Sequence, residues 1–300
     1  MKKALILLST YNGEKYLKDL LHSLRFQDSK NTEISILVRD DGSSDSTIDI
    51  LTEYQSLMKL HYYIGKNLGP SGSFINLVNN APLDYDFYFF CDQDDVWKKD
   101  KIISSIECIS LDKSTIPILY YCSLDIVDAN LNKTGVYFRN TKYFSSLKLT
   151  LMTGVVIPGC TMAFNNCLMQ IAKTYIPIKV NMHDHWIVLV CLLFNGKVIG
   201  DKKSLILYRQ HGKNVVGIKK LNLLKRIKRF LSKKNVFSNN YKELLKFPLS
   251  SKRENTEIVN IFANYQSNFS YKLKLLKLKS KELSFKEIIL FKIKIFFNLL

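Results

Sequence analysis

The chain has 300 residues and 47% of them are hydrophobic, which is enough for one large domain or two small ones and excludes a wholly disordered chain. Its formal net charge of +18 is unevenly distributed, because residues 218–300 hold 20 Lys or Arg and 5 Asp or Glu, whereas residues 1–217 hold 24 and 21. We therefore predict two parts, a nearly neutral domain over 1–217 and a basic, mainly helical extension over 218–300.

Apolar runs typical of buried strands alternate with helical spacing along the first part of the chain. We expect strands at 4–8, 34–38, 60–64 and 87–91, with helices between them at 16–24, 47–57 and 73–79. Strands that alternate with helices through short connections are typical of a parallel α/β sheet. After about residue 120 the pattern is less regular, and we expect helices at 166–174 and 184–194 and strands at 197–199 and 205–208.

Cysteine spacing and hydropathy indicate in which cellular compartment the protein would lie. The six cysteines are scattered without a Cys-x-x-Cys pair, which is typical of reduced thiols in a cytoplasmic protein rather than of a disulfide framework or a zinc site. The apolar run at 4–8 is too short for a signal peptide, so we expect none. The sequence has no clean run of about 20 apolar residues, so we expect no transmembrane helix.

Polar clusters at 10–12, 40–41 and 92–95 each follow a predicted strand. In a parallel α/β sheet, ligands bind at the carboxyl ends of the strands. The three clusters therefore predict a site at that edge of the sheet.

The cluster Asp92-Gln93-Asp94-Asp95 is the sharpest of these features. Asp92 and Asp94 are two residues apart, so they project to the same side of an extended chain. Paired carboxylates suit Mg²⁺ or Mn²⁺, which prefer oxygen ligands and commonly bridge to substrate phosphates. The alternative is that one Asp caps a helix beginning near Val96 and the others are solvated. The position directly after a buried strand favours metal and nucleotide binding.

A carboxylate at Asp40-Asp41 has two interpretations of similar weight. It could accept the imide N–H of uracil or thymine, a donor that cytosine lacks, or it could form a turn and helix cap without any ligand. The sequence contains neither a Gly-x-Gly-x-x-Gly after the first strand nor a P-loop, which disfavours a dinucleotide dehydrogenase and a P-loop enzyme. Diphosphate binding would then depend on a metal.

Two later clusters carry further candidates. Asp184 precedes an apolar helix and suits a general base, whereas the adjacent histidines around it point to different faces of a helix and make a poor metal site. A simple helix cap is the alternative for Asp184. At the end of a predicted strand, Arg209 could contact phosphate and His211 could bind a metal, although two exposed loop residues without a role explain this segment equally well.

Together these clusters resemble the family 2 inverting glycosyltransferases with the GT-A fold, most closely the bacterial rhamnosyltransferase-like members that build surface polysaccharides. The matching stretches occur in the family's order over about residues 4–217 and lie at 9–13, 39–45, 67–70, 91–97, 183–186 and 208–214. The family often has Glu-Asp or Asp-Asp at the base position, where this chain has His183-Asp184. The usual Gln-x-x-Arg-Trp motif is absent from the sequence, and 208–214 stands in its place.

The resemblance implies a Rossmann-like, mostly parallel sheet flanked by helices. It implies that Asp184 is the catalytic base and that Mg²⁺ or Mn²⁺ is the cofactor. The implied nucleotide-binding residues are Thr10, Tyr11, Asn12, Asp41, Asn67 and Asp92. The implied metal ligands are Asp92, Asp94 and His211. Further phosphate or acceptor contacts are expected from His183, Trp186, Arg209 and Asp95.

The implied reaction transfers a sugar, rhamnose or another hexose, from a dTDP- or UDP-sugar to a hydroxyl of a glycan acceptor that is typically lipid-linked. Charge builds on the leaving diphosphate and the sugar carbon becomes oxocarbenium-like. Asp184 takes the proton of the attacking hydroxyl, and the anomeric configuration inverts without a covalent intermediate.

The basic extension mixes Lys with large apolar residues at helical spacing, as in 225–231, 271–277 and 285–300. This pattern suits helices lying on an anionic membrane, which would make the protein peripheral at the inner face of the cell membrane. The alternative is a helical hairpin that packs on the catalytic domain.

Two other functions remain open from the residues. A basic protein without enzymatic activity could bind nucleic acid or membranes, but the sequence has no recognisable nucleic-acid motif, so we expect no specific nucleic-acid partner. A sugar nucleotidyltransferase would need a Gly-rich triphosphate loop with a Lys, which residues 1–30 lack.

Overall fold

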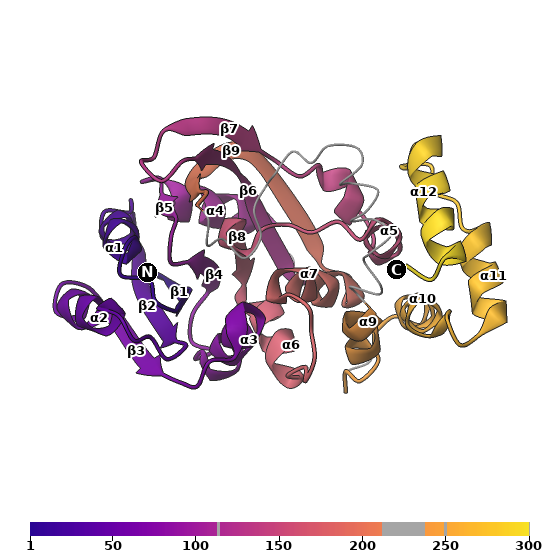
Figure 1. Cartoon of the computed structure of the whole chain (residues 1–300), viewed down its shortest axis with the longest axis horizontal. Helices are drawn as coiled ribbons and strands as arrows, with labels where there is room; N and C mark the ends of the chain where they lie inside the picture. The colour runs from indigo at the N-terminus through magenta and orange to yellow at the C-terminus, as the bar shows by residue number, and fades with distance from the viewer. Residues whose placement is uncertain (113–114, 212–237, 249–250, 300) are drawn as a thin grey trace.

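The computed structural model describes residues 1–112, 115–211, 238–248 and 251–299. Within these residues, nine strands form one mixed sheet with helices on both faces, and further helices follow at the C-terminal side (Figure 1). The first elements along the chain are β1 (Lys2–Thr10), α1 (Leu17–Arg25), β2 (Thr32–Asp40), α2 (Thr47–Gln55), β3 (Leu60–Ile64), α3 (Gly69–Asn80) and β4 (Phe87–Asp92).

The middle of the chain completes the sheet. Its elements are β5 (Val96–Trp97), α4 (Lys101–Ser110), β6 (Ile118–Val127), β7 (Lys133–Tyr137), α5 (Leu147–Thr153), β8 (Met162–Asn165), α6 (Asn166–Thr174), α7 (His183–Leu193) and β9 (Lys197–Arg209), with short 3₁₀ turns at Thr141–Phe144 and Gly159–Thr161. The helices after it are α9 (Ser238–Leu244), α10 (Arg253–Asn264), α11 (Phe269–Lys277) and α12 (Phe285–Phe296).

The strand order is β3-β2-β1-β4-β8-β6-β9-β5, and β7 pairs with β6. The strands β1 to β4 are mutually parallel, as predicted, whereas β8 runs antiparallel to both β4 and β6. Farther along, β6 and β9 are parallel again. The sheet therefore has a parallel half, β3 to β4 in the strand order, and a mixed half, and the two halves meet beside β4.

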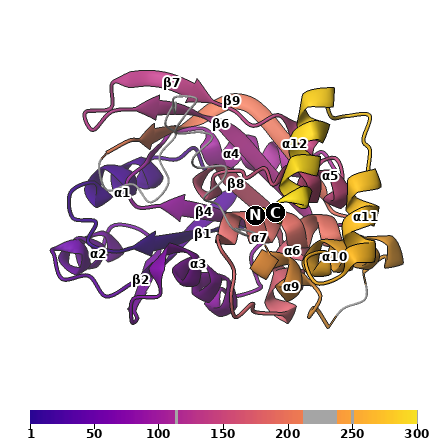
Figure 2. The ribbon, with the colours of Figure 1, turned by 45° about the vertical axis from the view of Figure 1, so that its right-hand side comes forward.

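Strand β1 is buried on both faces because its apolar side chains alternate between two hydrophobic cores. Leu5 and Leu7 contribute to the core that α3, α6 and α7 cover, which we call the α7 core. Ala4, Ile6 and Leu8 contribute to the core under α1, α2 and α4, which we call the α1 core. The apolar run that predicted this strand thus reflects two separate layers of helices (Figure 2).

The C-terminal helices complete the α7 core. Tyr241 of α9, Phe262 of α10, Leu275 of α11 and Ile295 of α12 have side chains that are 1% exposed or less and belong to this core. The described helices of the extension therefore pack on the preceding domain, which is the arrangement that the sequence left as the alternative to a membrane-bound helix. The predicted boundary at residue 217 lies outside the described residues.

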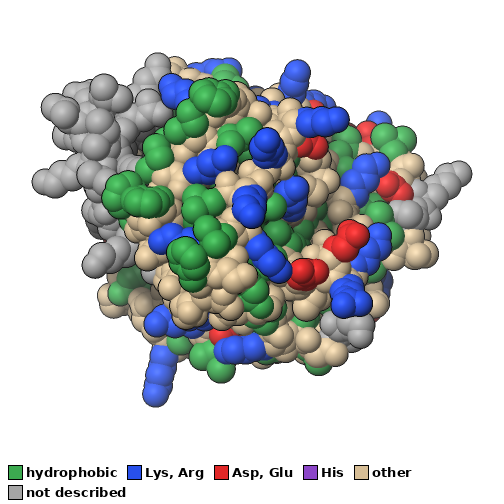
Figure 3. Space-filling model, turned by 90° about the vertical axis from the view of Figure 1, so that its right-hand side faces the viewer, with side chains coloured by type: hydrophobic (Ala, Val, Ile, Leu, Met, Phe, Trp, Pro, Cys, Tyr) green, Lys and Arg blue, Asp and Glu red, His purple; other side chains and the backbone are tan. Residues whose placement is uncertain are grey.

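The outward face of α11 and α12 has a different character from the buried one. Lys side chains lie among exposed hydrophobic side chains on this face (Figure 3). None of the helices within the described ranges has both the length and the apolar content to cross a lipid bilayer.

Three expectations from the sequence need correction. Val96 begins a short strand rather than a helix, because Val96 and Trp97 pair with Leu207 and Ile206 of β9, and the helix begins at Lys101. The two strands expected at 197–199 and 205–208 form one long strand, whose pairing with β6 is interrupted by register shifts. The third difference is β6, a strand at Ile118–Val127 that the sequence did not predict.

Candidate active site

The turn between β4 and β5 carries the Asp92-Gln93-Asp94-Asp95 cluster and is joined directly to the loop after β1. The Gln93 side chain accepts a hydrogen bond from the Tyr11 N–H (2.8 Å) and donates one to the Tyr11 carbonyl (3.0 Å). Gly13 leaves room for this contact, because a Cβ on Gly13 would collide with the Gln93 amide. Two of the predicted clusters therefore lie side by side, and Gln93, to which sequence analysis gave no role, joins them.

Three carboxylates converge beside this turn. Burial, together with the neighbouring charges of Asp94 and then Asp184, raises the pKa of Asp92 to about 7. Asp184 lies in the first turn of α7 and is 6% exposed, and its Oδ1 accepts a hydrogen bond from the His185 N–H (2.6 Å). Burial also raises the pKa of Asp184 to about 7. The fold thus brings the predicted metal-binding pair and the predicted base to one place.

His211 lies at the end of β9 and contacts the Asp-x-Asp cluster. Its Nε2 is 2.8 Å from Asp94 Oδ2, and its ring packs against Tyr16 at an interplanar angle of 32°, with 4.9 Å between the ring centroids. The predicted metal ligands Asp94 and His211 are therefore adjacent, although they are 117 residues apart in sequence.

Arg209 braces the site from within. Its guanidinium donates to the carbonyls of Asp94 (Nε, 3.0 Å) and Ala129 (NH1, 2.6 Å) and to the carboxylate of Asp19 (NH2, 2.8 Å). Its backbone N–H donates to Asp95 Oδ1 (3.2 Å). Asp95 is fully buried. Arg209 and Asp95 thus hold the turn through contacts within the protein, and the phosphate or acceptor contacts expected from them stay a prediction.

The donor set fits a hard divalent cation. Carboxylates from Asp92 and Asp94, with the imidazole of His211, are suitable ligands for Mn²⁺ or Mg²⁺, and a cation would neutralise the charges that raise the pKa of Asp92. Ligand atoms of Asp92, Asp95 and Cys160 lie within 4.8 Å of one another. The soft sulfur of Cys160 is a poor ligand for such a hard cation.

The predicted nucleotide residues at the ends of β1 and β2 form a network with each other. Thr10 is buried and donates to Asp40 Oδ1 (2.9 Å). Asp40 Oδ2 accepts from the backbone N–H groups of Gly42 (3.0 Å) and Ser43 (2.7 Å). Tyr11 is the next residue and its side chain is 47% exposed. The network therefore fixes the loop on which Tyr11 is presented.

Asp41 is buried beneath the start of α3. Its carboxylate pairs with Arg39 and accepts from the backbone N–H groups of Leu68 (2.9 Å) and Gly69 (2.9 Å). A negative charge at a helix N-terminus is stabilised by the helix dipole. The carboxylate that was predicted to accept a base imide thus already has three protein donors, and it positions the loop before α3.

Two asparagines shape the same rim. Asn12 adopts a left-handed conformation (φ 46°), which Asn tolerates better than most residues, and its Oδ1 accepts from the Ser44 N–H (2.9 Å). Asn67 is exposed, and its Oδ1 accepts from the Gly69 N–H (3.0 Å). Asn12 and Asn67 therefore brace the loops that follow β1 and β3.

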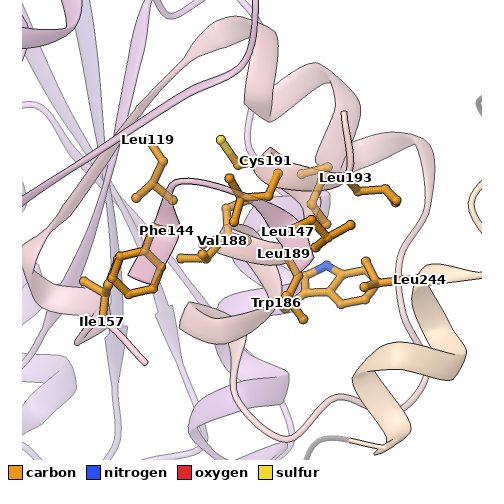
Figure 4. Close-up of a cluster of buried hydrophobic side chains, with 14 of the residues drawn as sticks. Leu119, Phe144, Leu147, Ile157, Trp186, Val188, Leu189, Cys191, Leu193 and Leu244 are labelled. Atoms are coloured by element: carbon orange, nitrogen blue, oxygen red, sulfur yellow. The ribbon is translucent and has the colours of Figure 1, made fainter. Parts of the chain in front are cut away.

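Two members of the 183–186 cluster are core residues, which corrects their expected acceptor contacts. The His183 ring stacks on Phe74, with 3.9 Å between centroids, and burial lowers its pKa to about 3. Trp186 is 2% exposed and stacks on Phe247, which follows α9 (Figure 4). Positions three apart share a helix face, so both side chains point into the α7 core while Asp184 points elsewhere.

Gly159 allows the Gly159–Thr161 turn to lie close to Asp184, the predicted base. A Cβ on this residue would lie 2.6 Å from His183 Nε2 and 3.5 Å from Asp184 Cβ. Only glycine therefore fits between the Gly159–Thr161 turn and the first turn of α7 without a shift of one of them. Sequence analysis gave this residue no role.

Comparison with known proteins agrees with this geometry. The Glycosyl transferase family 2 model matches residues 5–168. The chain is 31% identical over 227 residues to the dTDP-rhamnosyl transferase RfbG of Shigella flexneri, an alignment that covers 70% of this chain and 73% of that protein.

Solved structures show the same fold. TarS from S. aureus, in complex with UDP-GlcNAc, matches with a TM-score of 0.61 and 20% identity over 100% of this chain and 82% of that one. The mannosyltransferase PcManGT from Pyrobaculum calidifontis, in complex with GDP-Man and Mn²⁺, matches with a TM-score of 0.55 and 12% identity over 98% and 86%. The sequence match, the sheet and the gathered carboxylates together assign the chain to glycosyl transferase family 2, as a glycosyltransferase with the GT-A fold.

Proposed function

We propose that this glycosyltransferase moves a sugar, with rhamnose as the first candidate, from a dTDP- or UDP-sugar to a glycan hydroxyl during bacterial surface-polysaccharide synthesis. The observation that carries the proposal is the convergence of Asp184 with Asp92 and Asp94 at the carboxyl end of β4. The 31% identity to a dTDP-rhamnosyl transferase over most of both chains supports rhamnose and a thymidine nucleotide.

In this proposal Asp184 is the general base. Burial raises its pKa to about 7, so once ionised it is a stronger base than an exposed carboxylate and can take the proton of the acceptor hydroxyl as that oxygen attacks the sugar. The attack comes from the face opposite the departing nucleoside diphosphate, which inverts the anomeric configuration. A single carboxylate suffices because no sugar–enzyme bond forms.

Asp92, Asp94 and His211 would hold the divalent cation. When bound, Mg²⁺ or Mn²⁺ would neutralise the charge that develops on the leaving diphosphate. The Mn²⁺ in the mannosyltransferase complex of the same fold supports a metal-assisted donor site here. In the protein itself, the Gln93 and Arg209 contacts keep this turn in place before the donor arrives.

A donor screen tests the proposed activity. The full chain is incubated with Mn²⁺ and, in parallel, dTDP-rhamnose, UDP-galactose, UDP-glucose and UDP-N-acetylglucosamine, and release of the nucleoside diphosphate is measured. We expect dTDP-rhamnose to be hydrolysed fastest, and release of the nucleoside diphosphate to increase when a glycan acceptor is added. Fastest consumption of a UDP-hexose would replace rhamnose with that sugar, and consumption of none of the donors would contradict the proposed activity.

We also propose that the outward face of α11 and α12 rests on an anionic membrane, where lipid-linked acceptors would lie. The exposed apolar side chains of this face include Phe269 (74% exposed), Phe285 (80%), Phe296 (64%) and Phe297 (59%). Lysines of the same two helices lie among them. Apolar side chains that enter the interface, flanked by cations that attract acidic headgroups, suit this kind of surface.

Replacing Phe285 and Phe296 together by Ser should release the protein from anionic vesicles. Both side chains are largely exposed, so their loss removes apolar area from the membrane contact with little cost to folding. Flotation with phosphatidylglycerol-containing vesicles, at low and high salt, measures the effect. Phe26→Ser is the matched control, because Phe26 is 56% exposed but lies after α1.

This part of the proposal is contradicted if the double variant floats with the anionic vesicles as the unaltered protein does. Deleting 218–300 is the weaker experiment, because the deletion would also remove Tyr241, Phe262 and other side chains of the α7 core. A truncated chain could lose vesicle binding simply because it no longer folds.

A further inference from the structure

The helix α9 belongs to the C-terminal extension, yet it contacts the segment that carries the proposed base. Asn240 of α9 is fully buried. Its side-chain Nδ2 is 3.1 Å from His185 Nδ1, and its Oδ1 accepts from the Asn181 N–H (2.9 Å). His185 follows Asp184 directly, and Asn181 lies three residues before it. One amide therefore holds the chain on both sides of Asp184.

The protonation of His185 is compatible with this contact. Burial lowers the pKa of His185 to about 3, so the ring is neutral at physiological pH. A neutral ring can accept at Nδ1 from the Asn240 amide, which assigns the ring hydrogen to Nε2. The Asn240 oxygen remains available for the Asn181 N–H, so the two polar groups of the side chain each have a partner.

A second residue of α9 holds the same loop farther upstream. Glu243 is buried, and its Oε2 accepts from the Tyr175 hydroxyl (2.7 Å) and from the Ile178 N–H (2.9 Å). The loop between α6 and α7 has no regular secondary structure of its own. Its direction into α7 is therefore set by contacts from α9 at Tyr175, Ile178 and Asn181.

We propose that Asn240 is a positioning residue for sugar transfer, which fixes the first turn of α7 and thereby directs the Asp184 carboxylate toward the acceptor hydroxyl. The inference rests on the proposed role of Asp184 as the base. Asn240 contacts neither donor nor reacting atoms in this proposal; it acts through His185 and the Asn181 backbone. The extension is then part of the catalytic apparatus as well as a surface.

The chain offers a matched control at the C-terminal end of α7, the helix whose first turn Asn240 holds. Asn255 of α10 donates through Nδ2 to the carbonyls of Leu193 (2.9 Å) and Leu192 (3.2 Å), at the C-terminus of α7. It is also an extension asparagine that bonds α7, but eight residues from His185 the helix has risen by about 12 Å. Asn255→Ala should therefore cost stability without moving Asp184.

The test compares Asn240→Ala, Asn240→Asp and Asn255→Ala in the full chain, with dTDP-rhamnose or whichever donor of the screen is consumed. In Asn240→Ala we expect kcat for transfer to fall by about 10- to 100-fold, the cost of a misplacement of about 1 Å, with the KM for the donor unchanged. Asn255→Ala should keep kcat at the level of the unaltered protein while showing a comparable fall in melting temperature. Asn240→Asp keeps an oxygen for the Asn181 N–H but has no N–H for His185 Nδ1 and buries a charge beside it, so its kcat should also fall below that of Asn255→Ala.

Hydrogen exchange gives a readout that does not depend on activity. Amides of 181–186 should exchange faster in Asn240→Ala than in Asn255→Ala. The inference is overturned if Asn240→Ala retains the kcat of Asn255→Ala, if its loss appears only in the donor KM, or if Asn240→Asp turns over as fast as Asn255→Ala. Full turnover by Asp184→Asn in the same assay would instead reject the base assignment, so the two failures are distinguishable.

Discussion

Replacing Asp184 by Asn should slow sugar transfer by about 10²- to 10⁴-fold while donor binding and folding stay intact, because positioned general bases typically contribute that factor. Asn keeps the size of the side chain and an oxygen that can accept from the His185 N–H, which is 2.6 Å from Asp184 Oδ1. It lacks only the basicity. Steady-state transfer at saturating acceptor measures the loss, and calorimetry with the donor measures binding.

The pH profile of the unaltered protein supplies a second measure of the same base. Because burial raises the pKa of Asp184 to about 7, the carboxylate is protonated and inactive below that pH. The kcat/KM for transfer should therefore rise with pH through about 7 and then level off, and Asp184→Asn should lose this limb.

The helix cap that the sequence left as the alternative for Asp184 is wrong, because the N-cap of α7 is Met182 and Asp184 is the second residue of the helix. A carboxylate that only stabilises the first turn of α7 would lower the melting temperature in Asp184→Ala and leave turnover near normal in both variants. Near-normal transfer by Asp184→Asn would end the base assignment. His183 would not replace it, because its ring is packed against Phe74 and burial lowers its pKa to about 3.

Replacing Asp94 by Asn should make transfer at least roughly 10²-fold slower and weaken donor binding, because the charge stabilisation supplied by a catalytic cation is worth several kcal/mol. Asp94 is adjacent to His211 and shares the turn with Asp92, so the variant removes one anionic ligand without removing a buried apolar group. Titration of the donor with Mn²⁺, Mg²⁺ or excess EDTA measures the dependence. Asp49→Asn, on the exposed face of α2, is the control.

The expected pattern is a donor affinity that depends on the cation in the unaltered protein and in the Asp49 variant, and hardly at all in Asp94→Asn. Donor affinity that is the same in excess EDTA as in Mn²⁺ would remove the metal from the proposed mechanism. Equal affinity in the Asp94 variant and the unaltered protein would move the ligand role to Asp92 and His211 alone.

The strands β1 and β4 of the parallel half could be predicted from the sequence because they are buried on both faces, so each contains a continuous apolar run. The edge strand β3 was also expected at its observed bounds, Leu60–Ile64, although Ile64 is 57% exposed, and so was α6. The mixed half of the sheet could not be predicted in this way, since its strands form only by pairing with segments that are distant in the sequence. The two residues of β5 become a strand only because β9 lies beside them, and the pairing of β6 with β9 shifts register at Ser123.

The residues of the candidate site likewise fall into those that the sequence could predict and those that it could not. Asp92, Asp94 and Asp184 could be found because each stands in a local motif at the start or end of an expected element. The supporting residues had no such signal, because their roles come from partners far along the chain. Gln93 contacts a residue 82 positions away and Asn240 one 55 positions away.

The α7 core also constrains how the chain can reach its native state. It draws side chains from Leu5 in β1 and from Ile295 in α12, whereas the buried side chains of the α1 core within the described residues all come from positions up to Tyr208. During synthesis from the N-terminus, the α1 side can therefore close while the opposite face of the sheet still awaits its last helices. Until α12 emerges, that apolar face is open to chaperones and to aggregation, so premature termination should produce insoluble chains rather than smaller active ones.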